Sequence, residues 1–149
     1  RENGVLPITD KRMTRFNITL PEGVDFVLDS LEKMWGGELF VPKIPSYRIL
    51  DVAEAIAPDA KHEIIGIRPG EKLHEEMITK TDAINTLEFD NYYVILPSTS
   101  MWDIEKFRNE SNSSIGEMCE FGFSYDSGTN KQFLSVDELK QLIKDNLQS

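Results

Sequence analysis

Three short apolar runs, each followed closely by a proline, are the feature of this sequence that most limits its fold. They cover residues 39–41, 64–67 and 92–96. Runs of this length, rich in β-branched and aromatic side chains, predict buried strands, and proline ends a strand because it cannot donate a backbone hydrogen bond. Segments with the apolar spacing of helices lie between them. The sequence therefore predicts a small mixed α/β fold.

Apolar stripes predict helices over residues 22–34, 50–57 and 136–146. The segments 19–22 and 135–138 begin with threonine or serine and end with glutamate, which is the spacing of a capping box at a helix start. After the turn at Pro69 and Gly70, the apolar residues Leu73, Met77 and Ile78 predict a further short helix.

Residues 97–130 differ from the rest of the chain, because serine, asparagine and glycine become frequent between isolated aromatic residues. We interpret this stretch as a long irregular segment pinned by aromatic contacts and not as a second domain. The prediction is a single portion over residues 1–149, whose strands need strands from elsewhere to complete a sheet.

Composition excludes several classes of protein. The chain has 149 residues, 40% of them apolar, which suits one ordinary domain. Its net charge of −10 opposes general binding to nucleic acid or anionic lipid. No apolar run approaches the ~18 residues that a membrane span needs, and no signal-peptide pattern opens the chain. The single cysteine allows no disulfide framework. We expect a cytoplasmic protein.

Arg68 and Glu71 form the most informative pair for chemistry. Arg68 follows a predicted strand, and ligands of α/β folds gather beyond the carboxyl ends of strands. Its planar guanidinium matches phosphate oxygens, whereas the Glu71 carboxylate suits hydroxyl groups and repels anions. Together the two residues could hold the diphosphate and hydroxyls of a nucleotide sugar. The alternative is a surface ion pair between them on a tight turn.

A basic segment over residues 7–16 is the second candidate. It carries Arg15 among three basic residues, with hydroxyls at Thr9 and Thr14, and could wrap an anionic ligand with Arg15 on a phosphate. The alternative is a solvated basic loop.

Other reactive residue types predict no site. Cys119 has no basic neighbour that would activate it, so we interpret it as a packed thiol. His62 and His74 are not accompanied by a third residue at a metal-ligand spacing, so no metal site is predicted.

The segments ITDKRMTRFNITLPEG, GGELFVPKIPS and IIGIRPGEKLHEEMI resemble the C-terminal half of the inverting UDP-N-acetylglucosamine 4,6-dehydratases. That family begins the pathway to pseudaminic acid and belongs to the extended short-chain dehydrogenase/reductase superfamily. The resemblance implies a substrate-side subdomain that lacks the Rossmann half. It also implies contacts between the UDP-sugar and Thr9, Arg68 and Glu71, with a diphosphate-binding arginine at Arg15. We expect these four residues to converge on one side of the fold.

The resemblance also implies what this chain lacks. The family binds NADP at a Gly-rich turn and uses a Tyr-x-x-x-Lys pair, and neither pattern occurs in this sequence. We therefore predict no catalytic residue and no cofactor in this chain, NADP in the full-length lyase, and no activity of the chain alone. Expected partners are a UDP-sugar, the missing Rossmann half, which would leave exposed apolar surface, and further copies in a homo-oligomer.

Two alternatives stay open at this point. One is a non-catalytic fragment that binds nucleotide sugars or other partners. The other is a part of a retaining sugar-nucleotide dehydratase or an epimerase from the same superfamily.

Overall fold

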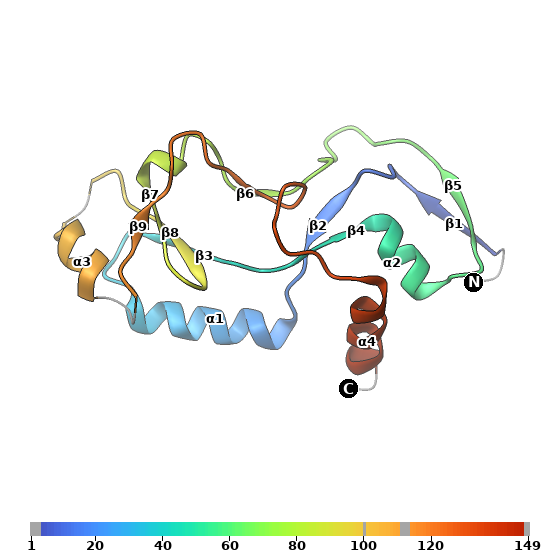
Figure 1. Ribbon diagram of the computed structural model, residues 1–149, viewed down its shortest axis with the longest axis horizontal. Helices are drawn as coiled ribbons and strands as arrows, with labels where there is room; N and C mark the ends of the chain where they lie inside the picture. The colour runs from blue at the N-terminus through green and yellow to red at the C-terminus, as the bar shows by residue number, and fades with distance from the viewer. Residues whose placement is uncertain (1–3, 100, 111–113, 148–149) are drawn as a thin grey trace. The chain divides into compact units, whose positions relative to one another are not determined.

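The computed structural model describes residues 4–99, 101–110 and 114–147. The elements in chain order (Figure 1) are β1 (Val5–Ile8), β2 (Thr14–Phe16), α1 (Leu20–Lys33), β3 (Leu39–Pro42), β4 (Ser46–Arg48), α2 (Ile49–Ile56), β5 (Lys61–Ile64), β6 (Glu76–Ile78), the 3-10 helix η1 (Ala83–Asn85), β7 (Thr86–Glu88), β8 (Tyr92–Ile95), α3 (Ile104–Glu110), β9 (Glu117–Met118), β10 (Tyr125–Asp126) and α4 (Val136–Leu147).

Contacts divide the chain into two compact units. Unit 1 consists of Arg1–Asn17, Ile44–Glu75 and Asp126–Ser149, and unit 2 consists of Ile18–Lys43 and Glu76–Tyr125. Each unit therefore combines segments that are distant in the sequence, which local periodicity cannot reveal. A single functional portion over residues 1–149 stays a prediction.

Unit 2 is built on a four-stranded antiparallel sheet with the strand order β3-β8-β7-β9. The predicted strands over residues 39–41 and 92–96 are confirmed as β3 and β8. Aromatic and aliphatic side chains from β7, β8, the residues directly after these two strands, and α3 form the core. Its buried members are Leu87, Phe89, Tyr92, Val94, Leu96 and Phe107.

The stretch 97–130 is less irregular than the sequence predicted. It contains α3, β9 and β10, so the prediction of a segment without regular structure is wrong over those residues. The predicted aromatic contacts are confirmed: the Phe107 ring lies 4.7 Å from the Trp102 ring, and the Phe123 ring lies 5.4 Å from the Tyr93 ring. These aromatic contacts bury apolar surface that the polar residues of the stretch cannot bury, and so they stabilise the short elements α3, β9 and β10.

Helix α1 carries the predicted capping box. The Glu22 carboxylate accepts a hydrogen bond from the Thr19 backbone N–H at 2.8 Å, while the Thr19 hydroxyl accepts one from the Glu22 N–H at 3.4 Å. Hydrogen bonds from the Thr19 hydroxyl and N–H hold the pKa of Glu22 below its usual value. The helix runs close to the predicted range of 22–34 and begins two residues earlier.

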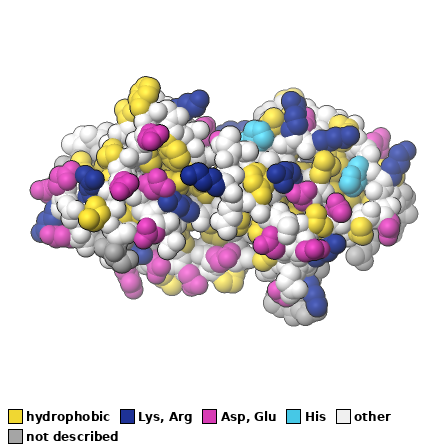
Figure 2. Space-filling model, in the orientation of Figure 1, with side chains coloured by type: hydrophobic (Ala, Val, Ile, Leu, Met, Phe, Trp, Pro, Cys, Tyr) yellow, Lys and Arg dark blue, Asp and Glu magenta, His cyan; other side chains and the backbone are white. Residues whose placement is uncertain are grey.

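One face of α1 is apolar but uncovered. All of its residues are described and none is buried; Leu20, Val27 and Leu31 are 81%, 57% and 59% exposed. Such a stripe normally faces a core. Figure 2 shows apolar side chains at the surface of the chain, interspersed with acidic ones. The expectation of exposed apolar surface is confirmed.

Tyr92 carries the one described buried side-chain polar atom without a hydrogen-bond partner, its hydroxyl oxygen. Burial, followed by the carboxylates of Asp29 and Asp90, raises the pKa of this phenol to about 12. Since an unpaired buried hydroxyl costs free energy, Tyr92→Phe is expected to keep or raise the free energy of unfolding, by as much as about 1 kcal/mol. Urea unfolding of the protein measures this.

The matched control is Tyr93→Phe, on the same strand. The Tyr93 side chain is 6% exposed, and its hydroxyl bonds to Glu88. Tyr93→Phe is therefore expected to cost about 1 kcal/mol. A loss of stability in Tyr92→Phe as large as in the control would contradict the prediction.

The described residues of unit 1 form two small sheets and two helices. Strands β1 and β5 pair in parallel, and β2 and β4 pair antiparallel. Helix α2 lies against α4, with Ala53 and Leu139 buried. Both helices confirm the predicted ranges of 50–57 and 136–146.

Two predictions in unit 1 are wrong. The strand predicted over residues 64–67 lies earlier, as β5 at Lys61–Ile64, because its partner β1 ends at Ile8 and Gly66 turns the chain with φ +86°. The helix predicted after Gly70 does not form either. The Leu73 and Glu75 carbonyls accept backbone hydrogen bonds from Thr14 and Ser127, so they have partners outside any helix.

Candidate functional site

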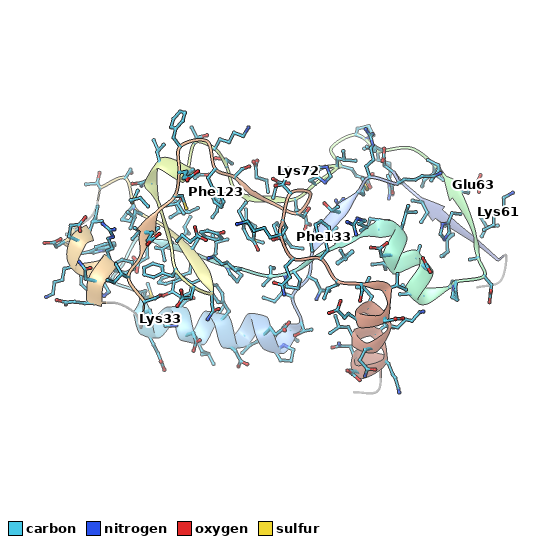
Figure 3. The ribbon with its side chains drawn as sticks, in the orientation of Figure 1. Lys33, Lys61, Glu63, Lys72, Phe123 and Phe133 are labelled. Carbon is cyan, nitrogen blue, oxygen red and sulfur yellow. The ribbon has the colours of Figure 1, made fainter. Side chains whose placement is uncertain are left out.

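Arg68 and Glu71 lie on a tight turn of unit 1, next to Lys72, which Figure 3 labels. The Glu71 N–H donates to the Arg68 carbonyl at 3.1 Å, and the Arg68 N–H donates to the Glu71 carboxylate at 3.0 Å. Gly70 has a φ angle of +85°, a backbone conformation that residues with a side chain rarely adopt. The sequence explains this turn, but Glu71 does not open a helix as predicted.

The side chains of the same two residues form an ion pair, with 3.0 Å between Arg68 Nε and Glu71 Oε1. The Arg68 side chain is 72% exposed. An exposed ion pair stabilises a protein by about 0–1 kcal/mol, whereas a hydrogen bond to a charged group contributes about 1.5–3 kcal/mol. The ion pair that was the alternative for Arg68 therefore forms, and it contributes little to stability.

Arg15 is tied into its own unit. Its Nη1 donates to the carbonyls of Thr14 and Leu73, at 2.6 and 3.2 Å, and its Nε lies 3.8 Å from the Glu75 carboxylate. The side chain is 22% exposed. These contacts make Arg15 a brace between β2 and the stretch 73–75. Its predicted contact with a diphosphate stays a prediction.

The predicted site residues all lie in unit 1. The Ile65 N–H donates to the Ile8 carbonyl at 2.9 Å, so Thr9 leaves β1 at the end of the sheet where the chain runs on toward Arg68. Thr9 is half-buried there. Arg15 touches Leu73, two residues beyond Glu71. Arg68 and Glu71 are thus in direct contact, and the segments that carry Thr9 and Arg15 are each hydrogen-bonded to an end of their loop. That all four side chains converge on one site stays a prediction.

A buried polar cluster next to this loop was missed by sequence reasoning. The Thr14 hydroxyl lies 2.8 Å from His74 Nδ1 and 2.7 Å from the Ser127 hydroxyl. Ser127 also accepts a hydrogen bond from the Glu75 N–H at 2.9 Å. Thr14 and Ser127 are 5% and 0% exposed. We call Thr14, His74 and Ser127 the hydroxyl–histidine cluster.

Asp126 shapes the turn that follows Ser127. Its carboxylate accepts hydrogen bonds from the N–H groups of Gly128 and Thr129, at 2.9 and 3.0 Å. Burial raises the pKa of Asp126, but the hydrogen bonds from Thr129 and Gly128, together with the nearby His74, outweigh it, so the pKa is lowered. Asp126 therefore stays ionised and holds this turn beside His74.

Cys119 is half-buried, and burial, followed by the Glu88 carboxylate, raises the pKa of its thiol to about 11. This environment agrees with the packed thiol predicted from the sequence. Among the described residues, no group of His, Cys, Asp and Glu side chains could hold a metal ion.

Alkylation at pH 8 tests the state of Cys119. A thiol whose pKa rises from 9.0 to about 11 has roughly 100-fold less thiolate at pH 8, which slows alkylation. Each thiolate is about tenfold more nucleophilic, because nucleophilicity increases with pKa, and this compensates for part of the loss of rate. We expect Cys119 to react with iodoacetamide about tenfold more slowly than a free cysteine peptide. Mass spectrometry of the folded protein measures the rate, and the urea-unfolded protein is the control. A rate equal to that of the peptide would contradict the packed environment.

These observations define a mixed α/β chain with an arginine–glutamate turn beside a parallel strand pair, as the sequence predicted for the fold class. The chain belongs to a family described as polysaccharide biosynthesis protein, which matches residues 1–97.

Within known proteins, the chain is 52% identical over 139 residues to the UDP-N-acetylglucosamine 4,6-dehydratase (inverting) of Campylobacter jejuni strain 81-176. The match covers 93% of this chain and 42% of that protein. The chain is 29% identical to the UDP-glucose 4-epimerase of Rickettsia conorii, over 96% of this chain and 42% of that protein. The predicted resemblance to the inverting dehydratases is confirmed, and the chain spans about two fifths of the length of these relatives.

Two further proteins are similar to this chain. The X-ray structure of Pen from Bacillus thuringiensis matches with a TM-score of 0.76 and 25% identity, over 98% of this chain and 43% of that one. An uncharacterized membrane protein of Methanocaldococcus jannaschii is 33% identical over 97% of this chain and 42% of that protein. Within the described part of this chain, no helix has the length and apolar character to cross a membrane.

Proposed function

We propose that this chain is the substrate-binding part of a cytoplasmic UDP-N-acetylglucosamine 4,6-dehydratase that inverts C5, a lyase of pseudaminic acid biosynthesis. The observation that carries the proposal is the identity of 52% to an inverting dehydratase over 93% of the chain. Identity to the UDP-glucose 4-epimerase of Rickettsia conorii is 29%, which favours the dehydratase over the epimerase alternative.

The Arg68–Glu71 turn is the centre of the proposed site. Arg68 is exposed and leaves its weak ion pair to bind the diphosphate, while Glu71 is freed to accept hydrogen bonds from sugar or ribose hydroxyls. Thr9 supplies a further hydroxyl at the end of β1. Arg15 adds a positive charge near the turn. To bind a phosphate, its guanidinium would have to break one of its hydrogen bonds to the carbonyls of Thr14 and Leu73.

The two helices with capping boxes do not favour NADP binding at their N-termini. Helix N-termini are the usual sites for a pyrophosphate, but those of α1 and α4 are each closed by a capping carboxylate, Glu22 and Glu138, which would repel it. We therefore place the cofactor and the catalytic residues in another part of the full-length protein. The exposed apolar face of α1 is the proposed surface against which that Rossmann part packs.

Product analysis tests the proposal. The full-length protein that contains this chain, supplied with UDP-N-acetylglucosamine and NADP, is expected to form the 4-keto-6-deoxy sugar with C5 inverted, as read by NMR. The chain of 149 residues alone is expected to show no turnover. Retention at C5 would indicate a retaining dehydratase, a C4 epimer would indicate an epimerase, and UDP binding without turnover would indicate a binding protein.

A further inference from the structure

His74 belongs to a hydrogen-bond chain whose direction the structure determines. The chain starts at the Glu75 backbone N–H, which can only donate, and Ser127 Oγ accepts from it at 2.9 Å. Ser127 is 0% exposed, so its own hydroxyl hydrogen needs an acceptor, and Thr14 Oγ1 lies 2.7 Å away.

The next step fixes the state of the histidine. If Ser127 donates to Thr14, the Thr14 hydroxyl has its hydrogen free to donate to His74 Nδ1, at 2.8 Å. With a protonated Nδ1 donating to Thr14, the Thr14 hydroxyl could accept from both neighbours, which leaves its own buried hydrogen without an acceptor among the described residues, or it could donate to Ser127. In the second case the buried Ser127 hydrogen has no acceptor among the described residues, so either case leaves one buried hydroxyl hydrogen unpaired, which is costly.

The imidazole ring is also fixed in place. A Cβ atom on Gly128 would lie 2.5 Å from His74 Nδ1 and 2.7 Å from Cγ, so the ring rests directly on the Gly128 backbone. Asp126 is near enough for His74 to lower the pKa of its carboxyl group, but this carboxylate already accepts hydrogen bonds from Gly128 and Thr129. Nδ1 is therefore left to Thr14.

The ring connects β2 with the loop of the proposed site. The Thr14 N–H donates to the Leu73 carbonyl at 3.1 Å, and the Phe16 N–H donates to the Glu75 carboxylate at 2.8 Å. His74 lies between these two attachments. The same loop is attached at its other end by the hydrogen bond from Ile65 to Ile8. The Arg68–Glu71 turn lies between the two attached ends.

We propose that His74 is a positioning residue: as the neutral tautomer protonated on Nε2, it accepts a hydrogen bond from Thr14 and so sets the position of the Arg68–Glu71 turn for a UDP-sugar. This proposal rests on the proposed function of that turn. A ligand group displaced by a fraction of an ångström loses much of its contribution, so a positioning contact affects binding without touching the ligand.

Two amide variants of the full-length protein separate the roles of the ring nitrogens. The amide oxygen of His74→Asn occupies the place of Nδ1 and can still accept from Thr14, whereas the amide of His74→Gln reaches only the place of Nε2. Calorimetry with UDP is expected to show an affinity within about threefold of wild type for His74→Asn and a loss of roughly tenfold for His74→Gln. Equal losses in the two variants, with wild-type binding intact, would overturn the positioning role.

Nitrogen NMR of His74 tests the tautomer without any ligand. We expect an unprotonated Nδ1 and a protonated Nε2; a protonated Nδ1 would overturn the proposal. If the expected tautomer is found but the wild-type protein does not bind UDP, the proposed function fails and the positioning role fails with it. Circular dichroism of both variants verifies that they fold, and His74→Asn is the matched control for His74→Gln.

Discussion

Replacing Phe107 with alanine is expected to lower the free energy of unfolding by about 3–5 kcal/mol, the usual cost of deleting a fully buried aromatic side chain. Phe107 is 0% exposed. Its ring centroid lies 5.4 Å from that of Trp35 and 4.7 Å from that of Trp102, so one substitution removes several aromatic contacts of unit 2 together. Urea unfolding of the protein, followed by tryptophan fluorescence, measures the change.

Phe121→Ala is the matched control, because Phe121 lies in the same unit and is 92% exposed. Its substitution is expected to change stability by less than about 0.5 kcal/mol. Since Phe107→Ala could unfold the protein entirely, Phe107→Leu provides a measurable intermediate, with an expected cost of about 1–2 kcal/mol. A loss below about 1 kcal/mol in Phe107→Ala would show that this core does not stabilise unit 2.

The elements that the sequence predicted correctly carry their signals locally. The capping boxes at Thr19 and Ser135 satisfy backbone N–H groups within three residues, so they form whatever surrounds them. The strand β8 likewise consists of Tyr and β-branched residues, which favour extended backbone, and it ends before Pro97. In these places local preference and the final fold agree.

The errors fall where distant segments decide the conformation. Residues 73–78 have the apolar spacing of a helix, but Thr14 and Ser127 supply backbone partners for Leu73 and Glu75 that a helix would exclude. The register of β5 is set by the length of β1, about 55 residues earlier. Neither constraint has a signal in the local sequence. Long-range pairing therefore overrides periodicity in this unit.

The candidate site likewise contains one part with a local sequence signal and one part that depends on contacts between distant segments. Arg68 and Glu71 are three residues apart, and their residue types alone indicated both a nucleotide-sugar contact and the ion pair that forms. The hydroxyl–histidine cluster joins residues 60 and 113 positions apart. Thr14 and His74 were noted in the sequence for other reasons, but only the fold shows that they meet.

Replacing Arg68 with alanine in the full-length protein is expected to weaken UDP binding by roughly 10- to 150-fold, or about 1.5–3 kcal/mol, because a charge-assisted contact to the diphosphate is lost. The substitution should leave the protein folded, because the ion pair with Glu71 contributes at most about 1 kcal/mol to the free energy of unfolding. The lower affinity can therefore be assigned to the lost contact and not to unfolding. Arg68→Lys is expected to recover only part of the affinity, because an ammonium group cannot reproduce the two-pronged contact of a guanidinium. Calorimetry with UDP measures all three proteins.

Arg48→Ala distinguishes a specific contact from a general loss of positive charge. Arg48 is also exposed, lies in unit 1, and pairs with the carboxylate three residues ahead, with 3.4 Å between its Nη1 and Asp51 Oδ2. Removing it changes the net charge of the protein by the same amount, so any long-range effect on an anionic ligand should be similar. We expect Arg48→Ala to bind UDP within about twofold of wild type. If Arg48→Ala and Arg68→Ala lose the same affinity, or if neither loses any, Arg68 is only the surface partner of Glu71 and the proposed diphosphate contact is wrong.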